Sequence, residues 1–246
     1  MGTVNLANAA EKMYALILAG GKGERLRPLT EDLPKPMVPL CGKPILWHQV
    51  QWLKRAGVTH VVFLAGYHWE AIQEFFGDGS SHGFHALYSV EESPLGRGGA
   101  IRKGMELVPK EERCVTVTNG DIITGEDPDL VVDSFLRRYE ADPSHRATIM
   151  VVPFLSPYGL VDLNSRDEVE GFREKAELPF WINGGIYVFS RQMEQDLPEL
   201  GDHESSTFAA LAAQGKLTAV RSQAFWTSVD SFKDLREAED FLKAAG

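Results

Sequence analysis

Residues 16 to 44 read LILAGGKGERLRPLTEDLPKPMVPLCGKP, and this stretch decides the fold. It begins inside an apolar run, residues 14 to 18, of the kind that forms a buried parallel strand. The run ends in a loop with almost no side chains, Gly20–Gly23, and cations follow at Arg25 and Lys35. Glycines let backbone N–H groups approach a ligand, and a loop rich in them forms an anion-binding concavity. The stretch therefore predicts a site for a nucleoside triphosphate.

Two standard phosphate motifs do not fit this stretch. A Walker loop requires Gly-Lys-Ser/Thr, whereas Gly23 is followed by Glu24. The dinucleotide fingerprint G-x-G-x-x-G fails at its third glycine, where the chain has Leu26. The glycines alone also fit an ordinary strand-to-helix turn of an α/β protein. Lys35 favours the ligand site, because it stands between two prolines on a segment that they keep out of regular helix and sheet. Arg27 fits a phosphate contact or a solvated surface position equally well.

The rest of the chain alternates predicted strands and helices. The first half contains a helix over 45–55, a strand over 58–65, a helix over 70–76, a strand over 84–90, a helix over about 100–108 and a strand over 114–118. The second half contains a helix over 129–139, a strand over 147–154, an antiparallel hairpin from 158–163 and 169–173, a strand over 181–190, a helix over 206–214, a strand over 217–222 and a helix from Phe232, capped by Ser231 and Asp234. The alternation predicts an α/β fold, a Rossmann-like and mostly parallel sheet flanked by helices.

No linker, repeat or low-complexity segment divides the chain. We expect residues 13–246 to form a single domain, with a nucleotide-binding half at about 13–125. The substrate-binding half, at about 126–246, carries the smaller antiparallel hairpin. Residues 1–12 lack the apolar core of a signal peptide, and we interpret them as a loose extension.

The composition narrows the function classes. A net charge of −10 over 246 residues argues against broad nucleic-acid binding, so an anionic substrate must be met by local cations and a metal ion. Cys41 and Cys114 make neither a disulfide framework nor a zinc cluster, and a reducing cytoplasm is the expected location. No apolar run reaches the length needed to span a membrane. His82 and His85 are neighbours in a Gly/Ser loop and are expected to be solvated rather than metal ligands.

Two aspartates are candidate metal ligands. Asp121 follows Gly120 at the end of a predicted strand, and Asp230 ends the apolar segment 225–229. Ligands of parallel sheets lie beyond the carboxyl ends of the strands, where Gly20–Gly23, Gly66 and Asp121 all fall. Magnesium commonly takes one or two carboxylates together with substrate phosphates and water, which suits this pair. Asp121 also fits an ordinary turn or helix cap.

The stretch from Leu16 to Pro44 resembles the signature of the sugar-1-phosphate nucleotidyltransferases, with Glu24 where the usual form has Thr. The resemblance extends over residues 14 to about 242. It implies that a sugar-1-phosphate oxygen attacks the α-phosphorus of a nucleoside triphosphate while Mg²⁺ is held by Asp121 and Asp230. It further implies catalytic roles for Arg25, at the leaving phosphates, and Lys35, between the reacting phosphates. The implied nucleotide-binding residues in this part of the site are Leu18, Ala19, Gly20, Gly21, Gly23 and Gly120.

The segment YSVEESPLGRGGAI, residues 88–101, resembles the base-recognition loop of this family, with Arg97 where Thr is usual. It adds Gly96 and Glu91 to the nucleotide-binding set. Glu91 or Glu92 can only accept hydrogen bonds when ionised, and guanine offers two adjacent donors at N1 and N2, so an acid here favours GTP. A charged pair on a solvated loop is the alternative.

Gly159, Glu174, Lys175 and Asn183 match positions at which the family binds the sugar phosphate. Without the resemblance, Glu174 and Lys175 read as surface charge. The motifs look most like the mannose-1-phosphate and manno-heptose-1-phosphate guanylyltransferase branch, and uridylyltransferases of N-acetylmuramate-1-phosphate come next. A metal-dependent glycosyltransferase and a non-catalytic nucleotide-sugar sensor are the alternatives of other classes. The positions of Arg25 and Lys35 suit a triphosphate and so count against a glycosyltransferase. The presence of Lys35, Asp121 and Asp230 counts against a non-catalytic sensor. We expect no nucleic-acid or membrane partner and leave a homo-oligomer open.

Overall fold

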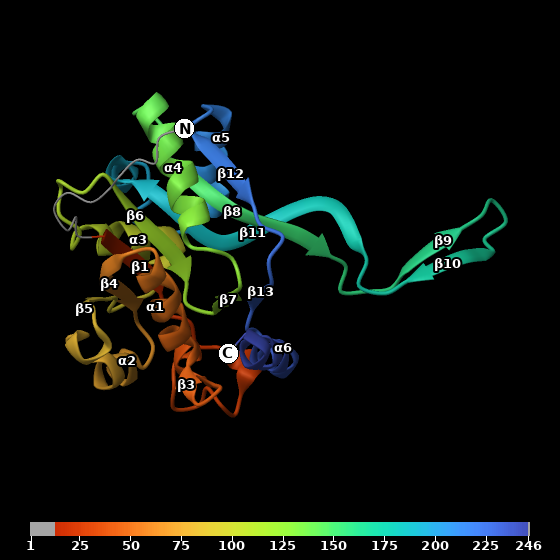
Figure 1. The fold of residues 1–246 in the computed structure, drawn as a ribbon, viewed down its shortest axis with the longest axis horizontal. Coiled ribbons are helices and arrows are strands. Elements are labelled where there is room, and N and C mark those ends of the chain that lie inside the picture. The colour runs from red at the N-terminus through yellow and green to blue at the C-terminus, as the bar shows by residue number, and fades with distance from the viewer. Residues whose placement is uncertain (1–12, 246) are drawn as a thin grey trace.

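A seven-stranded sheet forms the centre of the molecule. The computed structural model describes residues 13–245, so the predicted extension at residues 1–12 lies outside the described residues. The sheet order is β12-β8-β11-β6-β1-β4-β5 (Figure 1). Its strands are β1 (Met13–Leu18), β4 (Val58–Ala65), β5 (His85–Val90), β6 (Cys114–Asn119), β8 (Ala147–Leu155), β11 (Glu177–Ser190) and β12 (Leu217–Arg221). β11 runs antiparallel to β6 and β8, and the other pairs are parallel. The predicted α/β fold with a mostly parallel sheet is confirmed.

Helices cover both faces of this sheet. They are α1 (Ile45–Arg55), α2 (Trp69–Phe76), α3 (Gly96–Met105), α4 (Asp129–Ala141) and α5 (Ala209–Ala213). A further helix, α6 (Phe232–Ala245), packs beside β2 (Pro39–Leu40) and β13 (Trp226–Ser228) instead. Successive side chains of β1 point to opposite faces, and both are buried. Leu16 packs in the core with Ile101 of α3, whereas Ile17 packs in a second core with Val50 of α1. This two-sided burial explains why the central strands read as continuous apolar runs.

Short antiparallel pairs complete the fold. They are β2 (Pro39–Leu40) with β3 (Lys43–Pro44), β7 (Ile122–Thr124) with β13 (Trp226–Ser228), and β9 (Leu160–Leu163) with β10 (Val169–Arg173). The β9–β10 hairpin confirms the predicted antiparallel element and projects from the body as an arm (Figure 1). Its strands carry exposed apolar side chains, at Val161, Leu163, Val169 and Phe172. Within the described residues, no helix combines the length and apolar character that crossing a membrane requires.

Several predicted boundaries are wrong for identifiable reasons. The helix expected over 100–108 begins earlier, at Gly96, because Gly98 and Gly99 form its first turn despite their low helix propensity. A Cβ on Gly99 would lie 2.5 Å from the carbonyl oxygen of Glu199, so close packing requires glycine there. The helix expected over 206–214 starts with a π-helical turn, Glu204–Phe208, and continues as α5.

The prediction for His82 also needs correction. Its ring is half-buried, its Nε2 lies 3.1 Å from the carbonyl oxygen of Phe75, and it stacks on the Phe75 ring. The glycine and serine residues of this loop predict a solvent-exposed histidine. Instead, Phe75 and Phe76 at the end of α2 contact the His82 ring. His85 is exposed, as predicted.

Candidate functional site

Side chains far apart in sequence meet at the carboxyl ends of β1 and β6. The Nζ of Lys35 lies 2.6 Å from Asp121 Oδ2 and 2.6 Å from Asp230 Oδ1. Arg25 Nη2 lies 2.8 Å from the same Asp230 oxygen. Lys35 is only 8% exposed. Lysines are rarely buried to this degree unless they are paired with opposite charges, as Lys35 is here. The predicted catalytic cations and the predicted metal-binding carboxylates therefore form one cluster, which we call the Lys35 cluster.

Backbone contacts hold the two aspartates beside each other. Asp121 lies in the turn between β6 and β7, and its carbonyl oxygen accepts a hydrogen bond from the N–H of Val229 at 2.9 Å. Val229 immediately precedes Asp230, so this hydrogen bond holds the main chain at Asp121 next to the main chain at Asp230. The N–H of Asp230 donates to Asp234 Oδ2 at 3.1 Å, and Ser231 Oγ donates to the same carboxylate. The predicted capping residues of α6 thus also fix Asp230.

Charge balance keeps Asp230 ionised. Burial raises the pKa of this carboxyl, but the hydrogen bond and charge of Lys35, with Arg25 and Ser228, lower the pKa below its usual value. Two cations, Lys35 and Arg25, face two carboxylates, so the Lys35 cluster has no net formal charge. A triphosphate would add negative charge to this neutral cluster. A further cation would offset that added charge.

The carboxylates fit a divalent metal ion bound jointly with phosphates. Asp121 Oδ1 is buried and has no hydrogen-bond partner among the described residues, although a buried carboxylate oxygen normally has one. No group of three or more His, Cys, Asp or Glu side chains with metal-site geometry occurs between residues 13 and 245. Two carboxylates with substrate oxygens are a common arrangement for Mg²⁺. Asp121 and Asp230 are the residues here that would hold it.

The glycine loop packs directly against the Lys35 cluster. Gly23 has φ +65°, and a Cβ there would lie 2.7 Å from Lys35 Cβ, so only glycine fits. The N–H of Lys35 donates to the Gly21 carbonyl oxygen at 3.3 Å. Gly21 itself is open, with nothing within 4 Å of a Cβ placed on it. The main chain of Gly21 and Gly23 therefore lies against Lys35, while space remains open beside Gly21.

The other predicted nucleotide residues divide into two groups. The N–H of Ala19 donates to Leu64 at 2.8 Å, and that of Gly120 donates to Leu18 at 2.8 Å, so both amides are engaged within the fold. A Cβ on Gly20 would lie 3.2 Å from Glu91 Oε1, which brings the carboxylate of Glu91 to the glycine loop.

Glu91 is held in this position by the start of α3. Its Oε2 accepts a hydrogen bond from the N–H of Leu95 at 2.9 Å, whereas Glu92 is exposed. Gly96 has φ +75°, and a Cβ there would lie 2.6 Å from the Gly201 carbonyl oxygen. Gly96 is thus required by close packing. Of the two acids in the predicted base-recognition loop, Glu91 is the one beside the glycine loop.

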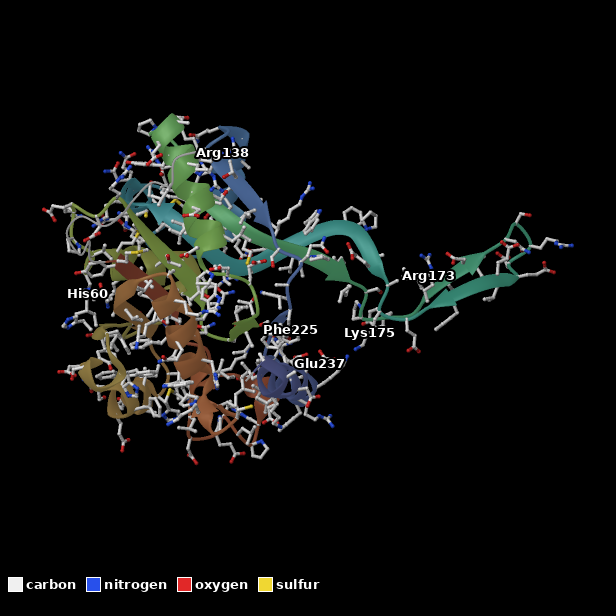
Figure 2. The ribbon with its side chains drawn as sticks, viewed as in Figure 1. His60, Arg138, Arg173, Lys175, Phe225 and Glu237 are labelled. Atoms are coloured by element: carbon white, nitrogen blue, oxygen red, sulfur yellow. The ribbon has the colours of Figure 1, made fainter. Side chains whose placement is uncertain are left out.

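Three of the four predicted sugar-phosphate residues line one pocket at the base of the arm. The pocket has a volume of about 420 Å³ and is lined by Gly159, Glu174 and Lys175, together with Tyr158, Lys233, Glu237 and the segment 155–157. Lys175 Nζ lies 3.3 Å from Glu237 Oε1 of α6, and Figure 2 shows the two residues side by side.

Asn183 does not line this pocket. Its amide donates to the Tyr187 hydroxyl at 2.8 Å, and its Oδ1 accepts from the N–H of Gly185 at 3.0 Å. Both ends of the side chain are therefore engaged within β11. Its predicted contact with the sugar phosphate stays a prediction.

Residues 14–245 match the sequence profile of the family described as Nucleotidyl transferase. The chain belongs to this family. The resemblance that the motifs indicated is confirmed, and the match includes the Lys35 cluster, the glycine loop and the pocket at the base of the arm.

Two curated members of the nucleotidyl transferase family illustrate the relationship. A mannose-1-phosphate guanylyltransferase from Mycobacterium tuberculosis is 35% identical over 245 residues, which cover 96% of this chain and 65% of that protein. A D-glycero-alpha-D-manno-heptose 1-phosphate guanylyltransferase from Aneurinibacillus thermoaerophilus is 32% identical, and the match covers 94% of this chain and 99% of that protein. The chain therefore spans about two thirds of the mycobacterial relative's length.

A solved structure of similar length is that of HddC from Yersinia pseudotuberculosis in complex with GMP-PN. It superposes with a TM-score of 0.69 at 25% identity, over 94% of this chain and 99% of that one.

Sequence reasoning missed Lys233, Glu237 and Gln49. Lys233 and Glu237 lie four residues apart on α6 and face the pocket together. That spacing is visible in the sequence, but it does not predict that the base of the arm contacts α6. Gln49 hydrogen-bonds the turn that carries Asp121. Nothing in the apolar periodicity of α1 distinguishes it from other polar positions of the helix.

Proposed function

We propose that this chain transfers a guanylyl group from GTP to a hexose- or heptose-1-phosphate of the manno type and releases pyrophosphate. The observation that carries the proposal is the Lys35 cluster, in which two cations and two carboxylates meet beside the glycine loop. The guanylyltransferase relatives support the choice of nucleotide and sugar. Glu91, beside the loop, offers an acceptor for the N1 and N2 donors of guanine.

The reaction is an in-line displacement at phosphorus. An oxygen of the sugar phosphate forms a bond to the α-phosphorus, and the bond to the β-phosphate breaks with its electron pair passing to pyrophosphate. Such transfers depend on positioning and charge stabilisation rather than on a protein nucleophile. Lys35 would screen the repulsion between the two reacting phosphates, and Arg25 would neutralise the leaving group. Mg²⁺ held by Asp121 and Asp230 would supply further positive charge at the phosphate oxygens.

The two substrates would bind at two different places in the molecule. The open face of Gly21 would accept the triphosphate, and the pocket at the base of the arm, with Lys175 and Lys233, would accept the sugar phosphate. A cytoplasmic location, where both substrates are made, belongs to the same proposal.

A substrate panel tests the proposal. The purified chain is incubated with ATP, CTP, GTP, UTP or dTTP, with mannose-1-phosphate or manno-heptose-1-phosphate and Mg²⁺, and pyrophosphate is measured. We expect release with GTP as the best nucleotide and no release without metal. Release from UTP alone would assign the chain to the uridylyltransferases of amino-sugar-1-phosphates. A chain that releases no pyrophosphate from any pair, while hydrolysing or transferring from a finished nucleotide sugar, would contradict the proposal.

A further inference from the structure

A buried glutamine contacts the turn that carries Asp121. Gln49 lies on α1 and is 4% exposed. Its Nε2 lies 2.6 Å from the carbonyl oxygen of Asn119 and 2.9 Å from that of Ile122. Asn119 is the last residue of β6 and Ile122 the first of β7, so they flank the turn formed by Gly120 and Asp121. One amide group thus bridges both ends of this turn.

The chemistry of the contact fixes the orientation of the amide. Carbonyl oxygens can only accept hydrogen bonds, so the NH₂ group of Gln49 must face the turn. Gln49 Oε1 points elsewhere, is buried and has no hydrogen-bond partner among the described residues. An unpaired buried acceptor is unfavourable, and an apolar side chain of similar length would avoid that penalty. The advantage of glutamine over an apolar side chain at this position is therefore its two donated hydrogen bonds.

The remaining contacts of the turn come from other elements. The N–H of Gly120 donates to Leu18 of β1, and the carbonyl oxygen of Asp121 accepts from Val229. Asp121 Oδ2 contacts Lys35, and its buried Oδ1 has no hydrogen-bond partner among residues 13 to 245. Gln49 thus completes a frame that fixes the main chain on both sides of Asp121.

We propose that Gln49 is a positioning residue, which holds the carboxylate of Asp121 in place for the metal ion and the phosphates. The inference rests on the proposed function, and Gln49 acts through the turn without touching a substrate. Side chains that orient a metal ligand typically change metal affinity or activity by about 10- to 100-fold when removed.

Four variants test this role. Gln49→Met keeps the length of the side chain without its donors, and Gln49→Glu keeps its shape. Gln51→Met makes the same chemical change on the same helix, away from the turn. Val50→Ala removes core packing from α1, because Val50 is fully buried. Each variant is compared with the parent by Mn²⁺ binding without substrates, followed by electron paramagnetic resonance, by the Mg²⁺ dependence of pyrophosphate release, and by melting temperature.

We expect both Gln49 variants to weaken Mn²⁺ binding about tenfold or more and to need correspondingly more Mg²⁺ for half-maximal rate. Gln51→Met should behave like the parent. Val50→Ala should melt earlier without a shift in either metal constant, which separates positioning from general destabilisation.

The inference is overturned if a folded Gln49 variant binds Mn²⁺ as tightly as the parent, if Val50→Ala shifts the metal constants equally, or if the parent binds no Mn²⁺. A parent that binds Mn²⁺ but transfers no nucleotide would contradict the proposed function alone, and the Mn²⁺ comparison would still decide the role of Gln49.

Discussion

Lys35 is a cation placed between two carboxylates in a largely dry site. Its side chain is 10% exposed, so it has lost most of its hydration, and the ion pairs to Asp121 and Asp230 offset that loss. In the proposed reaction, the same Nζ would also meet the phosphates. At the scale of single residues, the atoms that offset the burial of Lys35 are thus the ones proposed to serve the chemistry.

Arg25 and Arg27 give a matched pair for testing the leaving-group role. The Arg25 side chain is 76% exposed, so its ion pair with Asp230 contributes little to stability. The Arg27 residue is exposed, and its side chain makes no hydrogen bond or ion pair within the described part of the chain, whereas its backbone N–H donates to the Glu24 carbonyl oxygen. We expect Arg25→Met to lower kcat/KM for GTP by about a hundredfold, the usual effect of losing one transition-state donor. Arg27→Met should leave it unchanged, and steady-state kinetics that show equal effects of the two substitutions would refute the assignment.

His203 makes the stability of the protein depend on pH. Burial among Tyr187, Phe189 and Phe208 lowers the pKa of His203 to about 4, while Asp202 raises it and Arg97 lowers it further. The unfolded chain, with a histidine pKa of about 6.5, takes up a proton as the pH falls toward 4, and the folded protein does not. The free energy of unfolding therefore decreases as the pH is lowered, and His203 accounts for about 2 kcal/mol of this decrease between pH 7.5 and pH 5.

Urea denaturation at pH 7.5 and pH 5 measures this effect. Between pH 7.5 and pH 5, the free energy of unfolding of His203→Leu should decrease by about 2 kcal/mol less than that of the parent. Parallel losses in the parent and His203→Leu would show that His203 is not the group responsible.

At the scale of elements, the site depends on how closely strand ends approach each other. A Cβ on Gly120 would lie 2.4 Å from the Leu18 carbonyl oxygen, which is backbone and cannot rotate away. We expect Gly120→Ala to lower the free energy of unfolding by about 1–3 kcal/mol and to reduce activity, because the turn carrying Asp121 must shift.

Gly21→Ala is the control for this substitution. Nothing lies within 4 Å of a Cβ placed there, so its stability should stay within about 0.5 kcal/mol of the parent. Thermal and chemical denaturation of both variants check the prediction. A Gly120→Ala protein as stable as Gly21→Ala would contradict the close approach of β1 and β6.

The elements that the sequence predicts well are those whose pattern is local. The apolar periodicity of α1 and of β4 gave their bounds, 45–55 and 58–65, because both bury a regular face. The start of α3 was missed, because Gly98 and Gly99 are helical only through contacts with the distant segment 198–203. In the site, Asp121 and Asp230 were predicted from strand ends, whereas Gln49 and Glu237 depend on contacts that no local pattern encodes.

At the scale of the whole molecule, one sheet joins the two predicted halves. β11, from the second half, pairs with β6, from the first, and the core around Leu16 includes Tyr187 and Leu211. The two predicted halves thus share one sheet and one core. The single domain predicted for residues 13–246 should unfold in one transition.

Circular dichroism and tryptophan fluorescence test this expectation. Both signals should report the same midpoint in denaturant, because two-state unfolding makes different probes coincide. Separate midpoints would show that the halves unfold independently, and they would contradict the single domain.

The most direct measurement of the central claim is pyrophosphate release from GTP and mannose-1-phosphate by the parent and by Lys35→Met. The Lys35 cluster is proposed to stabilise charge at the reacting phosphates, so the variant should be slower by about a hundredfold or more. Circular dichroism must show the variant to be folded. A folded Lys35→Met protein that releases pyrophosphate as fast as the parent would contradict the account.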